Sequence, residues 1–375
     1  MLTVSAATLM FCAVLAVAYA NGANDTFKGV ATVYGGGSSD YRTALVWATG
    51  TTFSGSLVAG LFAHDLVAAF SGKGFVDAVA LADPSFVASV AFGAATTVFV
   101  AALAGIPIST THSLMGALVG AGLVASGSGV SLRSLGSGYV LPLAVSPFLA
   151  IFLVIVLYLA ARMVVRRFGL GPERCICVGA VESDFLGAGV GTLAARERFS
   201  VFTGDIAECR QAAAAPRGGL PGIEIASLLR KAHFLSAGAV SFARGTNDAP
   251  KIVGIALLAG SADLQVSTIA IAIAMALGGL LHSQRVARTV SRDILSFDER
   301  EGVIANLATS CLVISASTVG VPVSTTHVSI GSLFGLGMVK GNAHWRTVGG
   351  ITLSWFLTLP VAMASAALFH IVIGS

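Results

Sequence analysis

Residues 107–124 read Pro-Ile-Ser-Thr-Thr-His-Ser-Leu-Met-Gly-Ala-Leu-Val-Gly-Ala-Gly-Leu-Val, and residues 322–339 repeat the pattern as Pro-Val-Ser-Thr-Thr-His-Val-Ser-Ile-Gly-Ser-Leu-Phe-Gly-Leu-Gly-Met-Val. Each copy places a Pro and three hydroxyl side chains directly before an apolar stretch that predicts a helix. Hydroxyls and free backbone N–H groups at the N-terminus of a helix can bind an anion. The pattern therefore predicts two anion-binding helices in two similar halves. The hydroxyls belong to Ser109, Thr110, Thr111, Ser324, Thr325 and Thr326.

The composition is that of an all-α protein that crosses a membrane many times. Hydrophobic residues make up 55% of the 375 residues and charged residues only 11%, whereas soluble proteins carry about 25% charged residues. The mean hydropathy of +0.87 agrees, and most of the apolar surface is expected to face lipid or other helices. The net charge of +4 is too small and too scattered for a nucleic-acid-binding protein.

The first half contains five predicted spans. Their ranges are 2–20, 43–63, 85–104, a helix from Pro107 to about 124, and about 139–161. The first span leads into Asn21–Gly29, a stretch of polar residues and Gly that predicts a helix broken at membrane depth. Residues 1–20 end in Ala-Tyr-Ala, as at a signal-peptidase site. We expect this segment to be retained because the residues that follow it have a counterpart in the second half.

The second half repeats this order. The sequence Asn24-Asp25-x-x-Lys28 recurs 223 residues later as Asn247-Asp248-x-x-Lys251, again where a broken helix is expected. The ranges are 232–258 with a break at 244–251, then 265–281, 302–319, 322–339 and about 347–373. Because each half crosses the membrane an odd number of times, the two repeats are predicted to be inverted, with a binding site near the midplane.

The sequence divides into a first transmembrane repeat (1–165), a central segment (166–230) and a second transmembrane repeat (231–375). The Arg-rich central segment is expected in the cytoplasm, which places both termini outside. Within it, Cys175–Val181 and Phe199–Thr203 alternate as short strands do. The cysteines Cys175, Cys177 and Cys209 lack a fourth ligand and the usual spacing for zinc. We expect them to be reduced, packed thiols.

Two Gly-Ala/Thr-Asn-Asp motifs and two Pro-x-Ser-Thr-Thr-His motifs, one of each per half, resemble the inorganic phosphate transporter (PiT) family, which includes bacterial sulfate carriers. The resemblance extends over nearly all of the chain outside 166–230. It implies phosphate uptake coupled to sodium or protons, inverted repeats, a cytoplasmic central loop and a homodimer. It assigns phosphate binding to the six hydroxyls, and it assigns cation coupling, including a Na+ site, to Asn24, Asp25, Asn247 and Asp248.

The carboxylates have two interpretations. Asp25 and Asp248 lie in apolar surroundings, where an unpaired carboxylate is costly and usually functional. With the Asn oxygens and carbonyls freed by a broken helix, they could bind a small cation whose charge offsets that of phosphate. Alternatively, each Asp caps the next half-helix or is neutralised by the Lys three residues later. For the hydroxyls the alternative is helix capping, which explains one Ser per helix but not three hydroxyls twice.

One of the two lysines departs from the family pattern. Lys28 stands where many members carry a further Asn, whereas Lys251 resembles bacterial members. Either ammonium could replace a bound cation, contact phosphate or pair with its Asp. The histidines His112 and His327 could relay protons, although a hydrogen-bonded packing role is favoured.

The sequence thus predicts an inner-membrane secondary transporter that imports inorganic phosphate with Na+ or H+ by alternating access. The sequence implies no cofactor besides the transported Na+ or H+. The expected partners of the protein are phosphate and membrane lipid. A sulfate permease of the same family is the close alternative, since the residues do not decide between the two anions. A passive anion channel is less favoured. An enzyme is expected least, because no spacing of a nucleophile and a base stands out.

Overall fold

The computed structural model describes residues 4–126, 130–181, 198–214, 220–260, 263–292, 298–341, 343 and 345–374. The chain forms two compact units. The first, here the helical unit, contains residues 1–157 and 234–375, and the second, here the central unit, contains residues 158–233. The segment predicted to separate the two halves, 166–230, lies within the central unit.

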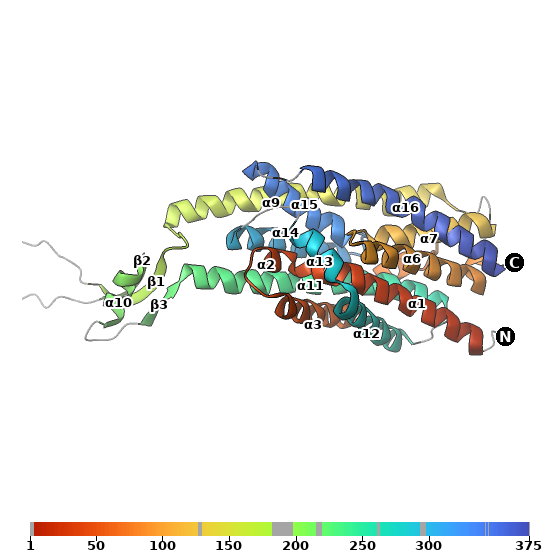
Figure 1. Ribbon diagram of the computed structural model, residues 1–375, viewed down its shortest axis with the longest axis horizontal. Helices are drawn as coiled ribbons and strands as arrows, with labels where there is room; N and C mark the ends of the chain where they lie inside the picture. Colours follow the sequence, from red (N-terminus) through yellow and green to blue (C-terminus); the bar gives the residue numbers. More distant parts are fainter. Residues whose placement is uncertain are drawn as a thin grey trace, which may run out of the picture. The chain divides into compact units, whose positions relative to one another are not determined.

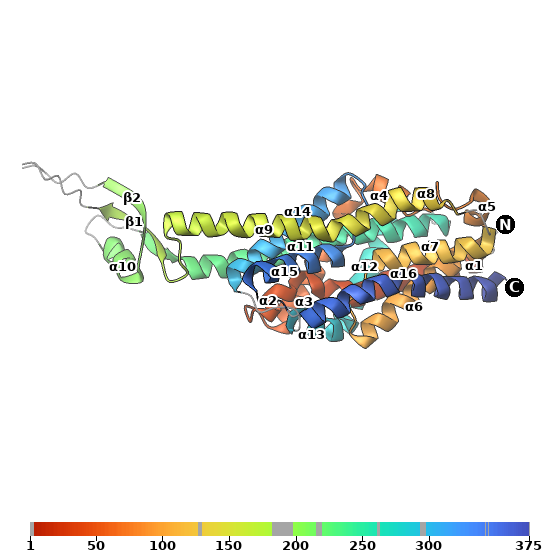
Figure 2. The ribbon, with the colours of Figure 1, turned by 90° about the horizontal axis from the view of Figure 1, so that it is seen from above.

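The helical unit is built of helices (Figures 1 and 2). In the first half they are α1 (Val4–Asp25), η1 (Thr26–Val30), α2 (Ala31–Gly35), α3 (Tyr41–Ala59), α4 (His64–Ala69), α5 (Ala78–Leu81), α6 (Pro84–Ala104), α7 (Thr110–Ser126), α8 (Leu132–Leu135), η2 (Gly136–Val140) and α9 (Leu141–Phe168). In the second half they are α11 (Ile225–Leu258), α12 (Leu264–His282), α13 (Gln284–Arg292), α14 (Glu299–Thr318), α15 (Thr325–Lys340) and α16 (Trp345–Gly374). The predicted all-helical fold of a polytopic membrane protein is confirmed.

Within the described residues, five helical stretches are long and apolar enough to cross a membrane. They are Pro84–Ala104, Arg133–Phe168, Leu264–His282, Glu299–Thr318 and Val348–Gly374. The helices α7 and α15 contain 17 and 16 residues, which is shorter than the roughly 20 residues of a full span. Both begin inside the helical unit, at the Ser-Thr-Thr-His sequences, and extend toward opposite ends of it (Figure 2).

The prediction of a broken helix is right in the first half and wrong in the second. The α-helix α1 ends at Asp25, and a 3₁₀ turn, η1, connects it to α2. In the second half α11 continues as one helix of 34 residues through 244–251, with Pro250 inside it. A proline removes one helical hydrogen bond, and neighbouring helices in a membrane protein compensate for that loss. Polar residues and Pro are therefore not sufficient to break this helix.

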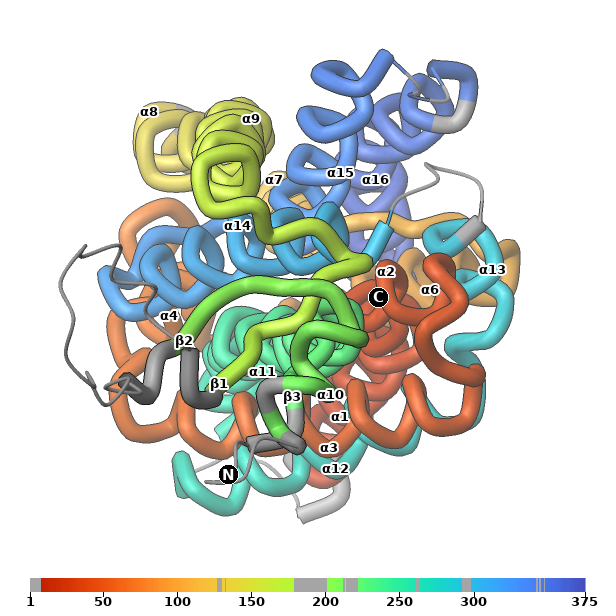
Figure 3. The backbone as a smooth tube through the Cα atoms, turned by 90° about the vertical axis from the view of Figure 1, so that its left-hand side faces the viewer, coloured from red at the N-terminus to blue at the C-terminus, as the bar shows by residue number. Residues whose placement is uncertain are grey.

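Glycines in both halves allow helices to touch backbone to backbone, as Gly22 and Gly245 show. A Cβ atom on Gly22 of α1 would lie 1.9 Å from the carbonyl oxygen of Met275 in α12. A Cβ atom on Gly245 of α11 would lie 2.1 Å from the carbonyl oxygen of Thr52 in α3. The first helix of each half thus packs against the second helix of the other half. In the end view, α11 lies in the interior among α1, α3 and α14 (Figure 3).

The central unit contains a three-stranded antiparallel sheet of order β2-β1-β3. Its strands are β1 (Cys175–Val181), β2 (Arg198–Gly204) and β3 (Leu220–Glu224), and the helix α10 (Ile206–Ala214) contacts them. Both predicted strands are confirmed. Of the basic residues that suggested a cytoplasmic segment, Arg196 and Arg217 lie outside the described residues.

The prediction that the cysteines of this unit are all reduced is wrong. Cys177 and Cys209 form a disulfide, while Cys175 is free and buried. Packing of α10 on β1 brings the two Cα atoms to 4.9 Å, within the range that a disulfide can bridge. Sequence spacing alone gave no sign of this contact, because the two cysteines are 32 residues apart.

Candidate functional site

The N-terminal turns of α7 and α15 meet inside the helical unit. Ser109 and Ser324 act as helix caps, because their hydroxyls accept from the backbone N–H of His112 and His327, each at 3.2 Å. The rings of these two histidines lie 4.5 Å apart between centroids. Two positive helix ends therefore lie close together, and the predicted pairing of the Ser-Thr-Thr-His segments is present in the structure.

The two segments also exchange hydrogen bonds. Thr111 Oγ1 donates to the carbonyl oxygen of Val323 at 3.3 Å, and Thr326 Oγ1 donates to the carbonyl oxygen of Ile108 at 3.1 Å. Each threonine belongs to one half, and the carbonyl that it contacts precedes the helix of the other half. The two halves therefore hold each other at equivalent positions.

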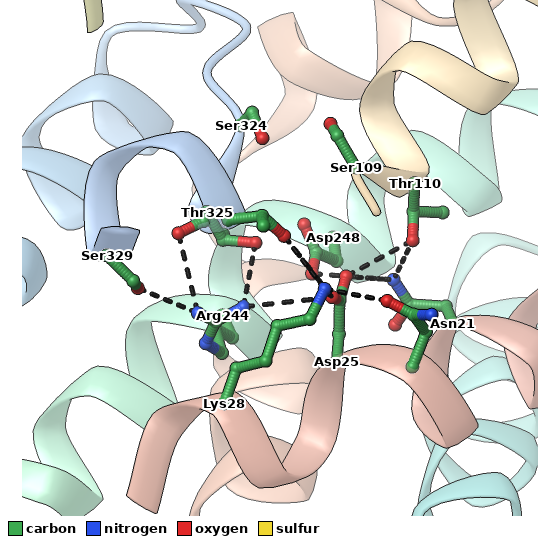
Figure 4. Close-up of polar contacts among 12 residues, drawn as sticks. Asn21, Asp25, Lys28, Ser109, Thr110, Arg244, Asp248, Ser324, Thr325 and Ser329 are labelled. Carbon is green, nitrogen blue, oxygen red and sulfur yellow. Dashed lines mark hydrogen bonds and ion pairs between the residues drawn. The ribbon is translucent and has the colours of Figure 1, made fainter. Parts of the chain in front are cut away.

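Asp25 connects the hydroxyls to the charged residues (Figure 4). Its Oδ2 atom accepts from Thr110 Oγ1 at 3.1 Å and from Asn21 Nδ2 at 3.1 Å. Its Oδ1 atom contacts the ammonium of Lys28 and lies 3.9 Å from a guanidinium nitrogen of Arg244. Hydroxyls predicted to bind an anion and carboxylates predicted to bind a cation thus form one network.

The second carboxylate lies in the same network. Asn21 Nδ2 lies 3.5 Å from Asp248 Oδ2, and so connects the two carboxylates. Asp248 Oδ1 accepts from Asn247 Nδ2 at 2.9 Å and lies 3.8 Å from the ammonium of Lys251. All of these side chains are buried.

The two asparagines of the Asn-Asp pairs hold the loops that precede α7 and α15. Asn24 accepts from the backbone N–H of Ile108 at 3.2 Å and donates to the carbonyl oxygen of Ile106 at 3.0 Å. Asn247 donates to the carbonyl oxygen of Val323 at 3.2 Å. Their amides therefore fix the loop carbonyls in place, a role that the sequence analysis did not assign to them.

Sequence reasoning missed two residues of the site, Asn21 and Arg244. They occupy equivalent positions in the repeat, 223 residues apart, and each precedes an Asn-Asp pair by three residues. Arg244 is only 1% exposed, and it donates to Thr325 Oγ1 at 3.1 Å and to Ser329 Oγ at 2.7 Å. An arginine within an apolar stretch was the signal available, because such a charge is costly in a membrane unless it serves a purpose.

The charges of this cluster do not cancel. Within the described part of the chain it contains three cationic and two anionic side chains, all buried. They are Lys28, Arg244 and Lys251 against Asp25 and Asp248. With all five ionised, the cluster carries one excess positive charge in a low-dielectric interior, where an uncompensated charge is expensive. An anion of single negative charge would balance it.

The two histidines have packing contacts at the edge of the site. The ring of His327 stacks on Trp355 with centroids 3.9 Å apart, and Nδ1 of His112 lies 2.9 Å from Ser109 Oγ. These contacts agree with the packing role favoured from the sequence.

The sequence pattern of one family matches residues 21–366, and this family is described as the phosphate transporter family. The chain belongs to the phosphate transporter family. It is 26% identical over 431 residues to the inorganic phosphate transporter 2-1, chloroplastic, of Arabidopsis thaliana, across 97% of this chain and 71% of that protein.

A solved structure described as the sodium-dependent phosphate transporter has the same fold. Its TM-score with this chain is 0.76 over 99% of both chains, at 21% sequence identity. The matched region of the phosphate transporter family contains all of the site residues described above, from Asn21 to Ser329.

Proposed function

We propose that this member of the phosphate transporter family is a secondary transporter that imports inorganic phosphate together with a cation by alternating access. The observation that carries the proposal is the buried cluster of three basic and two acidic side chains, located where two helix N-termini meet. Fixed charge and helix dipoles act together on an anion there. Phosphate in its monovalent form would neutralise the cluster.

Thr325 is suited to contact the anion directly. Its hydroxyl oxygen accepts from Arg244 at 3.1 Å, which leaves the hydroxyl proton for an acceptor such as a phosphate oxygen. The hydroxyls of Thr110, Thr111 and Thr326 donate to oxygens of the protein. They can be redirected to phosphate when the two halves move apart.

A buried acceptor favours phosphate over sulfate. Asn21 Oδ1 has no hydrogen-bond donor among the described residues, although Asn21 is fully buried. The orientation of the amide is fixed, because its Nδ2 atom donates to Asp25 and Thr110. A monovalent phosphate carries protons that can be donated to such an oxygen, whereas sulfate has none. A site built to hydrogen-bond such a group discriminates strongly against an analogue that lacks it.

The contacts between halves suggest how access could alternate. Thr111 and Thr326 each connect one half to the loop of the other, and these contacts would break and re-form as the halves rock. We infer that the repeats are inverted, with the Arg-rich central unit in the cytoplasm and both termini outside.

Uptake of radiolabelled phosphate into proteoliposomes tests the proposal. We expect phosphate to accumulate against its gradient, and accumulation to collapse when the driving ion gradient is dissipated. Sulfate at equal concentration should compete weakly. Uptake that stops at equal concentrations on both sides would instead indicate a passive channel, and strong competition by sulfate would contradict the role given to Asn21.

A further inference from the structure

The ammonium group of Lys28 lies in a cage of four oxygen atoms. It donates to Asn24 Oδ1 at 2.7 Å, to the carbonyl oxygen of Ile108 at 2.7 Å and to Thr326 Oγ1 at 2.9 Å. The fourth oxygen is Oδ1 of Asp25, the contact already described. The cage thus combines an amide oxygen, a backbone carbonyl, a hydroxyl and a carboxylate.

The ammonium of Lys251 has equivalent surroundings in the other half. It donates to the carbonyl oxygen of Val323 at 2.6 Å and to Thr111 Oγ1 at 2.8 Å, and its carboxylate partner is Asp248. In both cages the carbonyl comes from the lysine's own half and the threonine comes from the other half. The carboxylate, the carbonyl and the threonine therefore recur at equivalent positions of the sequence repeat, whereas among the described residues the contact of Lys28 with Asn24 Oδ1 has no counterpart at Lys251.

These oxygens are the kinds that bind a small hard cation. Carboxylates, amide oxygens and backbone carbonyls bind such ions in proteins, and backbone carbonyls coordinate coupling ions in transporters. The family resemblance assigned a Na+ site to Asn24, Asp25, Asn247 and Asp248, of which Asn24 and the two carboxylates belong to the cages. In the structure, however, each cage already contains a positive charge attached to the chain, and a sodium ion placed there would meet both occupied ligands and a like charge.

We propose that the ammonium groups of Lys28 and Lys251 are tethered substitutes for coupling sodium ions, so that phosphate binds and crosses without sodium at these two cages. The inference rests on the proposed function and makes it more specific, because it excludes sodium as the coupling cation at these two cages. Each lysine supplies the unit positive charge of a sodium ion. Each also links the two halves through a threonine of the opposite half, as a shared ion would.

Removing one ammonium should convert its cage into a sodium site. In Lys28→Ala and Lys251→Ala the lysine nitrogen is lost, and the carboxylate, carbonyl and threonine ligands remain. The matched control is Lys73→Ala, because Lys73 is exposed and lies outside the cluster. Purified proteins are heated in sodium chloride or in N-methyl-D-glucamine chloride of equal ionic strength. Phosphate uptake by the same proteins is measured in both salts.

We expect the wild type and Lys73→Ala to melt at the same temperature and to transport equally fast in the two salts. Lys28→Ala and Lys251→Ala should melt on the order of a few degrees higher in sodium, because a ligand that binds only the folded state stabilises it. Any uptake they retain should be faster in sodium.

A sodium-specific rise in the melting temperature of the wild type, or sodium-dependent wild-type uptake, would overturn the inference. It would also be overturned if both alanine variants fold but melt alike in the two salts. The melting comparison does not require transport. If the protein failed to accumulate phosphate, the proposed function would be contradicted. The melting temperatures would still decide whether the two cages bind sodium.

Discussion

Replacing Arg244 tests whether the fixed positive charge attracts the substrate. The guanidinium lies 3.1 Å from Thr325 Oγ1, and a phosphate oxygen bound to that hydroxyl would lie about 3 Å further away. At a separation of about 6 Å and an effective dielectric constant of about 20, one unit charge contributes about 3 kcal/mol. Arg244→Met should therefore raise the Kd for phosphate about a hundredfold.

The charge-retaining variant separates electrostatics from geometry. Arg244→Lys keeps the charge but loses the planar donors that reach Thr325 and Ser329, so we expect a loss of about tenfold or less, as for one weakened hydrogen bond to a charged group. Binding of radiolabelled phosphate to purified protein at fixed ionic strength measures both variants. Arg133→Gln is the charge control, because Arg133 is exposed and lies outside the cluster.

Wild-type affinity in a folded Arg244→Met protein would refute the electrostatic argument. Equal losses in the Met and Lys variants would refute it as well, because the charge would then not be the cause. Melting curves of all variants show which of them are folded, since removing one member of a buried ionic network can itself destabilise the fold.

Three further predictions concern the contacts that hold the site and the two units. Thr326→Val removes a hydroxyl that contacts the Lys28 ammonium and a loop carbonyl. Because a hydrogen bond to a charged group contributes about 1.5–3 kcal/mol, initial uptake rates should fall by about tenfold to a hundredfold. Ser54→Ala, on an exposed face of α3, is the control. Gly22→Ala places a Cβ atom 1.9 Å from a backbone carbonyl of α12, so the melting temperature should fall, whereas Gly50→Ala, with nothing within 4 Å, should not lower it. Cys177→Ser opens a disulfide that closes a loop of 32 residues and should destabilise the central unit by about 4 kcal/mol. The loss should appear as faster proteolysis of residues 158–233, and unchanged cleavage would contradict a stabilising disulfide.

The sequence was sufficient for the parts of the site that repeat. The Ser-Thr-Thr-His segments and the Asn-Asp pairs recur at fixed offsets, and the structure brings both copies together at one place. Periodicity also identified the apolar helices and two of the three strands described in the central unit. These features are local, so the composition of each segment determines them.

The features that could not be predicted from the sequence depend on contacts between distant segments. Asn21 and Arg244 join the candidate site because α1 and α11 pass the N-termini of α7 and α15, and the only local signal was a charged Arg244 within an apolar stretch. The disulfide depends in the same way on the packing of α10 on β1. The continuous α11 is a different failure, since polar motifs with Pro250 suggested a break that the surrounding helices make unnecessary.

The two cages differ in how closely the ammonium approaches its carboxylate, which the sequence cannot explain, since both contain Asp and Lys at the same spacing. Lys28 directly contacts Asp25, whereas the ammonium of Lys251 lies 3.8 Å from Asp248. Lys28 lies in the 3₁₀ turn η1, and Lys251 lies within the α-helix α11. Side chains three residues apart eclipse each other in a 3₁₀ turn but are offset in an α-helix. The local helix type therefore accounts for how closely each ammonium approaches its carboxylate. It follows that a change between α and 3₁₀ geometry at either Asp-x-x-Lys sequence would tighten or loosen its cage, with no exchange of ligands.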